Sequence, residues 1–261
     1  MLPEPGGFDS HTHMDIMGLP VDGVLAAARA AGLGRVVNVG CDLPSSRWSV
    51  ARAGEYPEVY AAVAIHPNET SALDGARAQV LAEVSALAQA PKVVAIGETG
   101  LDYYRDWASP DVQREWFRAH IEIARRTGKA LMIHDRDAHE DVLTILAETG
   151  PWPSYSVIFH CFSGDAAMAA RCAEAGYVMS FAGNVTFKNA DSLREAALVA
   201  PAELMLAETD APYLTPVPHR GKPNSPAMTA YTIRYLADLK KLDVAEFCAQ
   251  LQATGARVFA W

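Results

Sequence analysis

Short apolar or β-branched runs alternate with longer amphipathic stretches along the whole chain. A short run bounded by turn residues favours a buried strand, whereas apolar residues at three- and four-residue steps favour a helix. Eight such runs occur: Gly7–His13, Arg35–Cys41, Tyr60–His66, Val93–Glu98, Ala130–His134, Val157–His160, Tyr177–Phe181 and Glu203–Glu208. Repeated βα units of this kind predict an α/β protein with a parallel sheet, built as a (β/α)8, or TIM, barrel.

The clearest helices lie between these runs: Asp22–Ala31, Leu73–Ala90, Pro110–Thr127, Asp165–Ala175 and Ala227–Lys240. Within the third of them, Trp116, Phe117 and Ile121 recur at helical spacing, as a helix that covers a barrel requires. After the last strand, the proline-rich stretch Thr215–Pro226 predicts one long polar loop.

Length and composition favour one domain over residues 1–261, because a barrel of this class needs about 250 residues. Half of the residues are hydrophobic and 20% are charged, as in soluble globular proteins. Every apolar run is broken by charge or glycine before the roughly 18 residues that a membrane span needs. Residues 1–7 do not resemble a secretory signal. We therefore expect a cytoplasmic protein with no membrane contact and no obligate protein partner.

The net charge and the cysteine content narrow the possible classes of protein and of site further. A net charge of −9 argues against a protein that coats nucleic acid through its overall field, although a local basic patch or bound metal ions can supply positive charge. The four cysteines contain no CxxC pair, so the sequence favours buried thiols over a zinc knuckle or a disulfide framework.

Histidines gather where the predicted strands end. His11, His13, His66, His134 and His160 all fall at or near the carboxyl ends of such runs. In α/β barrels this edge carries the active site, because the following loops aim side chains from several strands at one point. Side chains two residues apart on a strand point to the same face, so His11 and His13 can both bind one ion. Such a pair alone is also compatible with two structural histidines.

Carboxylates complete a predicted two-metal site. Imidazole and carboxylate are common ligands of catalytic divalent metals, and one glutamate can bridge two ions about 3.5–4 Å apart. We expect a first ion on His11, His13, Glu98 and Asp210, and a second ion on Glu98, His134 and His160. Glu98 is then the bridge. Asp210 can also accept a proton from the attacking water, so Asp210 and Glu98 are the predicted catalytic residues.

Five separated segments resemble the motifs of the TatD family: Asp9–Asp15, Gly97–Tyr103, Ile133–Ala138, His160–Gly164 and Glu208–Pro212, joined by Arg220–Asn224. The resemblance covers nearly the whole chain in order. It implies a metal-dependent deoxyribonuclease-like phosphodiesterase of the amidohydrolase superfamily, acting on single-stranded or frayed 3′ ends of DNA and also on RNA. Thr12, Met14, Thr99 and Asp135 depart from the commoner family residues, and none of them is a predicted ligand.

Four further residues are predicted to contact substrate. His66 could bind a phosphate or orient a ligand, with a structural role equally compatible. Arg136 has the planar fork suited to bidentate phosphate binding, and Arg220 and Lys222 could follow a nucleic-acid backbone or simply belong to a solvated loop. Tyr103 and Tyr104 could stack on bases or serve only for packing. His120, His139 and His219 are left outside the site.

The sequence leaves alternatives open for the identity of the metal and for the reaction. The resemblance implies Mg²⁺ as the working ion, whereas four histidine ligands favour Zn²⁺ or Mn²⁺. One alternative is a binuclear amidohydrolase or esterase acting on a small molecule or an aminoacyl-tRNA. Its usual cue is a bridging lysine, but the fourth run ends in Glu98. A catalytically inactive binding protein is the other alternative, and such a protein would be expected to lack one of the six ligands.

Overall fold

The computed structural model describes residues 1–153 and 156–261. The chain divides into two compact units, Val39–His160 and Met1–Asn38 with Cys161–Trp261. Eight parallel strands alternate with helices along the chain, as the hydrophobic pattern predicts. No helix within the described ranges is long and apolar enough to span a membrane.

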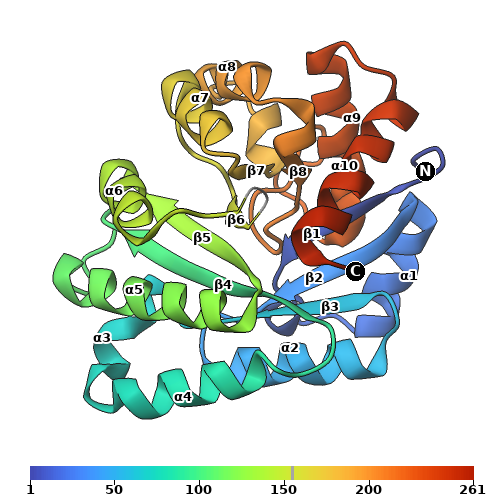
Figure 1. Ribbon diagram of the computed structural model, residues 1–261. Coiled ribbons are helices and arrows are strands. Elements are labelled where there is room, and N and C mark those ends of the chain that lie inside the picture. The colour runs from blue at the N-terminus through green and yellow to red at the C-terminus, as the bar shows by residue number, and fades with distance from the viewer. Residues whose placement is uncertain (154–155) are drawn as a thin grey trace. The chain divides into compact units, whose positions relative to one another are not determined.

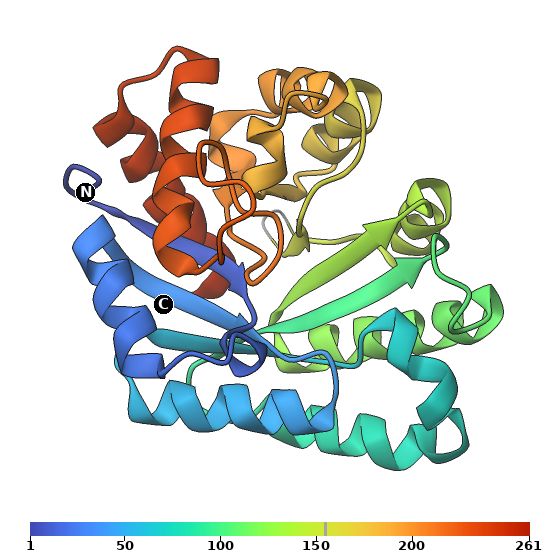
Figure 2. The same ribbon diagram turned by 180° about the vertical axis from the view of Figure 1, so that it is seen from behind.

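The unit Val39–His160 contains four parallel strands that pair in chain order: β3 (Val59–Val63), β4 (Val93–Asp102), β5 (Ala130–Arg136) and β6 (Val157–Phe159). Its helices are α2 (Leu43–Glu55), α3 (Thr70–Leu73), α4 (Arg77–Leu87), α5 (Pro110–Thr127) and α6 (His139–Thr149). Helices α2, α4 and α5 run side by side below these strands in Figure 1. Figure 2 shows the neighbouring strands β4 and β5 from behind.

Helix α5 shows how local signals and packing agree. Ser109 caps its first turn by accepting the N–H of Val112, and Gly128 ends it in the left-handed conformation. The buried face includes Trp116 and Phe117, and the helix packs against β4. The predicted bounds of this helix are confirmed.

The prediction of one helix over Leu73–Ala90 is wrong. A 3-10 turn over Asp74–Ala76 separates α3 from α4. The Asp74 carboxylate accepts the indole N–H of Trp116 at 2.9 Å, and Gly75 is a poor helix former. A side-chain contact with another helix and a weak helix former therefore coincide at the break.

Strand β4 also differs from its predicted bounds, because it continues past Glu98 to Asp102. Its second half pairs with β5 from Thr99↔Ile133 to Asp102↔Arg136, after a register shift that follows Ile96. Glu98 therefore lies inside a strand, not at its end.

The unit Met1–Asn38 with Cys161–Trp261 contains two strand pairs. β1 (Gly7–Thr12) pairs with β2 (Leu33–Val39), which ends at the unit boundary, and β7 (Val178–Phe181) pairs with β8 (Met205–Ala207). Its helices are α1 (Val21–Ala31), α7 (Ala166–Glu174), α8 (Asp191–Val199), α9 (Thr229–Lys240) and α10 (Val244–Phe259). Helix α10 packs against β1 and β8, where Phe8 meets Trp261 edge to face at 5.0 Å.

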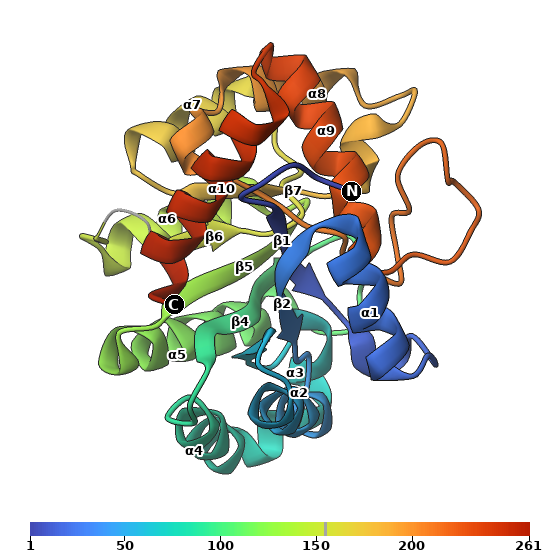
Figure 3. The same cartoon turned by 90° about the vertical axis from the view of Figure 1, so that its right-hand side faces the viewer.

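The segment between β8 and α9 is the long loop that the prolines predict, and Figure 3 shows it in orange. The loop ends at Pro226, which begins a 3-10 helix over Pro226–Met228. The buried amide of Asn224 donates to the carbonyl oxygens of Thr209, at 3.1 Å, and of Tyr213. This amide ties the end of the loop to the segment that follows β8.

Candidate metal centre

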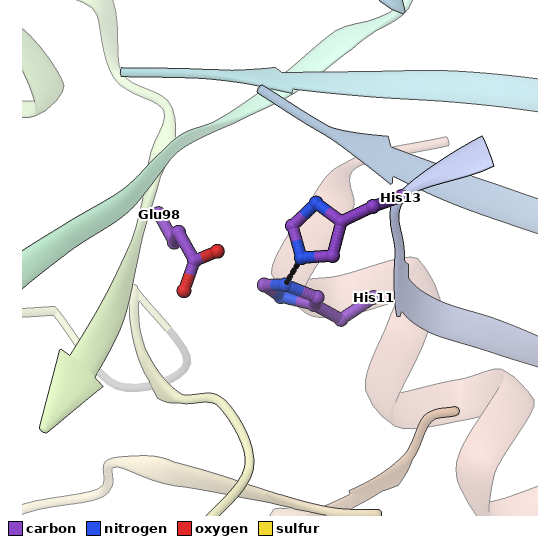
Figure 4. Close-up of side chains that lie close together, drawn as sticks. All are labelled: His11, His13 and Glu98. Atoms are coloured by element: carbon purple, nitrogen blue, oxygen red, sulfur yellow. Dashed lines mark hydrogen bonds between the residues drawn. The ribbon is translucent and has the colours of Figure 1, made fainter. Parts of the chain in front are cut away.

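His11 and His13 form the first group of donors. They lie at the end of β1 and directly after it, and both are buried. Their Nε2 atoms are 3.1 Å apart, as the dashed line in Figure 4 shows, and Figure 4 also shows the side chain of Glu98. The predicted common face of the two histidines is therefore confirmed. Two imidazole nitrogens that face each other in a dry environment suit a shared cation.

Asp210 joins these two histidines within the same unit. Its N–H donates to the His11 carbonyl at 3.0 Å, and the His13 N–H donates to the Ala211 carbonyl at 2.8 Å. Asp210 has a φ of 52°, a left-handed conformation that aspartate tolerates better than most residues. Its Oδ1 lies 3.5 Å from Nε2 of His13 and 3.9 Å from Nε2 of His11. Three predicted ligands thus converge, although Asp210 and His11 are far apart in the sequence.

Asp9 is a supporting residue that the sequence analysis did not single out, although it belongs to the first motif. Its carboxylate accepts the N–H of His11 at 3.3 Å, the N–H of Thr209 at 2.9 Å and the Thr209 hydroxyl at 2.5 Å. Burial raises the pKa of Asp9 well above its usual value, despite the opposing effect of these hydrogen bonds. Asp9 therefore links the histidine strand to the segment that carries Asp210.

Glu98 is the centre of the second group, which lies within Val39–His160. Its Oε2 is 2.8 Å from Nε2 of His160, 3.3 Å from Nδ1 of His134 and 3.8 Å from Nε2 of His66. Its Oε1 accepts the Cys41 thiol at 3.2 Å. The structure thus brings three predicted ligands together and adds two neighbours, His66 and Cys41. Cys41 lies beyond the end of β2, and no sequence motif around it would have predicted this contact.

Asp102 is the most important residue that the sequence analysis missed. Its side chain is fully buried, and its Oδ2 lies 3.2 Å from Nε2 of His134 and accepts the Asn68 amide at 2.9 Å. Its Oδ1 accepts the N–H groups of Tyr104 and Arg105, each at 3.1 Å. Burial alone would raise the pKa of Asp102, but the hydrogen bonds from His134 and Asn68 outweigh burial and hold that pKa below its usual range. Asp102 is therefore an anionic acceptor at neutral pH.

His134 consequently lies between two carboxylates. Burial by itself would lower the pKa of His134, yet the hydrogen bonds to Asp102 and Glu98 raise it above its ordinary value. With Nε2 directed at Asp102, Nδ1 is the nitrogen that faces Glu98 and His160. A histidine that donates one ring N–H to a carboxylate and presents the other nitrogen is typical of metal ligands.

His66 lies beside this group, in ring contact with His134 at 4.4 Å between centroids. Its Nδ1 accepts the Asn68 N–H at 3.1 Å, and burial, followed by the nearby His134, lowers the pKa of His66 to about 3. Burial therefore favours the neutral ring of His66.

Two of the three predicted cationic contacts, Arg136 and Arg220, lie over aromatic rings. The guanidinium carbon of Arg136 is 3.8 Å from the ring centroid of Tyr104, and that of Arg220 is 3.7 Å from the centroid of Phe187. Lys222 is exposed on the loop after β8. Substrate contact by these residues and by His66 stays a prediction.

The remaining histidines and cysteines have other surroundings. His120 is buried inside α5, His219 packs against Tyr231, and His139 begins α6, with Nδ1 2.7 Å from the Asp135 carboxylate. Cys172 and Cys248 are buried as predicted, whereas Cys41 and Cys161 are only half-buried.

Comparison with known proteins agrees with the motif analysis. Residues 8–260 match the family described as TatD related DNase. The chain belongs to the TatD family. It is 50% identical over 244 residues to the uncharacterized metal-dependent hydrolase TatD of Mycobacterium tuberculosis, covering 88% of this chain and 89% of that protein. It is 39% identical over 254 residues to an uncharacterized metal-dependent hydrolase of Bacillus subtilis, covering 97% and 98%.

The fold of the TatD family is confirmed by a solved structure. The crystal structure of a TatD homologue from Escherichia coli matches with a TM-score of 0.89 at 25% identity, covering 98% of both chains. The predicted (β/α)8 barrel class is therefore correct. Together with its relatives, this TatD family member is a metal-dependent hydrolase. The donor set agrees, since His66, Glu98 and His134 offer ligand atoms within 4.8 Å of one another.

Proposed function

We propose that the protein hydrolyses phosphodiester bonds of nucleic acid with two divalent ions, as a 3′–5′ DNA exonuclease that also accepts RNA. The observation that carries this proposal is the carboxylate of Glu98 in the middle of β4, with Oε2 2.8 Å from His160 and 3.3 Å from His134. A binuclear amidohydrolase would be expected to use a carboxylated lysine as its bridge. The match to TatD related DNases supports the same substrate class.

The ion assignment follows the sequence prediction. His11, His13, Glu98 and Asp210 would hold the first ion, and Glu98, His134 and His160 would hold the second. Two of these donor groups are already assembled within their own units: His11, His13 and Asp210, and Glu98, His134 and His160. Mg²⁺ is the expected working ion, and Mn²⁺ or Zn²⁺ binds more tightly to the nitrogen-rich donors.

Each side chain has a separate task in this proposal. A bound divalent ion would lower the pKa of a water molecule attached to it and so supply the nucleophile. Asp210, whose Oδ1 faces His13, would accept the proton of the attacking water. Asp102 holds His134 so that Nδ1 is presented to the metal. Arg136, Arg220 and Lys222 contact the phosphates of the substrate.

The test is incubation of metal-reconstituted protein with single-stranded DNA carrying a label at the 5′ or the 3′ end. A 3′–5′ exonuclease releases the 3′ label first as a mononucleotide and shortens the 5′-labelled strand stepwise. Glu98→Ala should abolish both, whereas Glu83→Ala, which removes a half-buried carboxylate next to Arg47, should not. Failure to cleave DNA or RNA with Mg²⁺, Mn²⁺ or Zn²⁺ would refute the proposal and favour a small-molecule or aminoacyl-tRNA substrate.

A further inference from the structure

The loop between β4 and α5 exposes two large aromatic side chains. Tyr104 is 63% exposed and Trp107 is 60% exposed. Large aromatic residues are usually well buried, because each can remove about 150–250 Å² from water. Two of them on one short loop therefore mark a surface for a ligand with flat apolar faces.

Each of these rings lies next to an arginine. The guanidinium carbon of Arg136 is 3.8 Å from the centroid of Tyr104, and that of Arg105 is 4.9 Å from the centroid of Trp107. We call Tyr104, Arg105, Trp107 and Arg136 the stacking surface. An aromatic face beside a planar cation matches a nucleotide, since the base can stack while the guanidinium binds the phosphate.

The loop is held in place from both ends. The N–H groups of Tyr104 and Arg105 donate to Oδ1 of Asp102, and the Gln113 amide donates to the carbonyl of Ala108 at 2.9 Å. Asp102 is also the residue whose Oδ2 lies 3.2 Å from His134. One carboxylate therefore positions both a predicted metal ligand and the start of the loop. A surface that is already ordered loses little entropy when a ligand binds.

Tyr103 is not part of this surface, although it neighbours Tyr104. Its hydroxyl donates to Asp141 at 2.7 Å, its N–H donates to the carbonyl of Arg136 at 2.9 Å, and the Arg114 guanidinium covers its ring at 5.7 Å. Burial and the bond to Asp141 raise the pKa of the Tyr103 hydroxyl to about 12. Of the two neighbouring tyrosines, Tyr103 is the packing residue and Tyr104 the exposed one.

We propose that the stacking surface binds unpaired bases of a single-stranded nucleic acid, with Tyr104 and Trp107 under the bases and Arg136 and Arg105 at the phosphates. This inference rests on the proposed function and specifies how its substrate is held. Asp106 and Asp137 are exposed on the same segments and offset the two arginines. Stacking, which salt does not screen, therefore supplies most of the affinity of this surface. A paired duplex hides its base faces and binds poorly here.

The test measures binding without cleavage. Fluorescence anisotropy of a labelled oligothymidylate in EDTA gives Kd for the wild type, Tyr104→Ala and Trp107→Ala. Each substitution should weaken binding about tenfold, within the range for loss of one stacked base. Trp107→Phe should restore most of the affinity. Trp152→Ala is the matched control, because Trp152 also lies under an arginine, Arg125 at 4.7 Å, but on a different segment.

A second oligonucleotide of abasic sugar phosphates separates stacking from charge. The wild type should bind the abasic strand more weakly than oligothymidylate, and Trp107→Ala should reduce this difference at both low and high salt, leaving the part that Tyr104 contributes. Equal affinity of wild type and Trp107→Ala for oligothymidylate would overturn the inference, as would tight wild-type binding to the abasic strand. Hydrolysis of bis(p-nitrophenyl) phosphate by the metal-loaded wild type tests the proposed function separately, since this diester carries no bases.

Discussion

His120 predicts a specific loss of stability in acid. The ring is fully buried within α5, and its Nε2 accepts the Ile65 N–H at 3.1 Å while Nδ1 donates to the Trp116 carbonyl at 2.8 Å. The Ile65 N–H can only donate and the carbonyl can only accept, so these partners require the neutral ring protonated at Nδ1. Burial lowers the pKa of His120 to about 4, although the bond to Trp116 raises it. A second proton would enter at Nε2, directly against the Ile65 N–H.

The magnitude follows from the two pKa values. The folded pKa of about 4 lies below the unfolded value of 6.5, so the unfolded chain binds more protons between these limits. The contribution of His120 is therefore complete above pH 6.5 and is lost as pH falls toward 4. At 1.36 kcal/mol for each pKa unit, the free energy of unfolding should fall by about 2 kcal/mol at pH 5 and about 3 kcal/mol below pH 4.

Urea unfolding of wild type and His120→Gln at pH 7 and pH 5, both in EDTA, measures this contribution of His120 to the free energy of unfolding. Glutamine can still accept from Ile65 and donate to Trp116, but it does not titrate. The variant should be less stable at pH 7 and should lack about 2 kcal/mol of the decline that the wild type shows at pH 5. His120→Asn serves if the glutamine does not fit. An equal decline in wild type and both variants, with unchanged m-values, would refute the reasoning.

Four further predictions concern the site and the loop after β8. Asp102→Asn removes the anionic acceptor of His134 Nε2, so metal affinity should fall about 10- to 100-fold by titration calorimetry; unchanged affinity would contradict a positioning role. EDTA should abolish hydrolysis and added Mn²⁺ restore it, and saturating metal should give two ions per chain. Glu98→Ala should weaken the binding of both ions, whereas His134→Ala should chiefly weaken the binding of one. Equal losses of affinity in these two variants would exclude Glu98 as the bridge. Asn224→Ala leaves the carbonyl of Thr209 without its amide donor, so urea unfolding should show a loss of about 1–3 kcal/mol, and no change would mean that water replaces the amide.

Much of the fold and part of the site chemistry can be predicted from the sequence because their signals are local. A strand or helix shows its buried face through a period of two or 3.6 residues, so the βα alternation is visible without any contact. The same period turns His11 and His13 to one side of β1. The motifs around these residues also resemble those of the TatD family, and the match of residues 8–260 to that family confirms the resemblance.

Other features depend on partners that are distant in the chain. The extension of β4 beyond Glu98 follows from pairing with β5, and the break before α4 coincides with the contact between Asp74 and Trp116. No periodicity encodes either contact. The one-domain prediction likewise stays a prediction, which coincident unfolding transitions by two probes would support.

Asp102 and the two neighbouring tyrosines show the same division of information. In the sequence Asp102 is one carboxylate among many, and Tyr103 and Tyr104 are equivalent. In the fold, Asp102 is buried against His134 and holds the next loop, Tyr103 is fastened to Asp141, and Tyr104 is left exposed under Arg136. Composition and spacing set which chemical groups are available, whereas burial and the partners brought in by packing set the charge, orientation and exposure of each group.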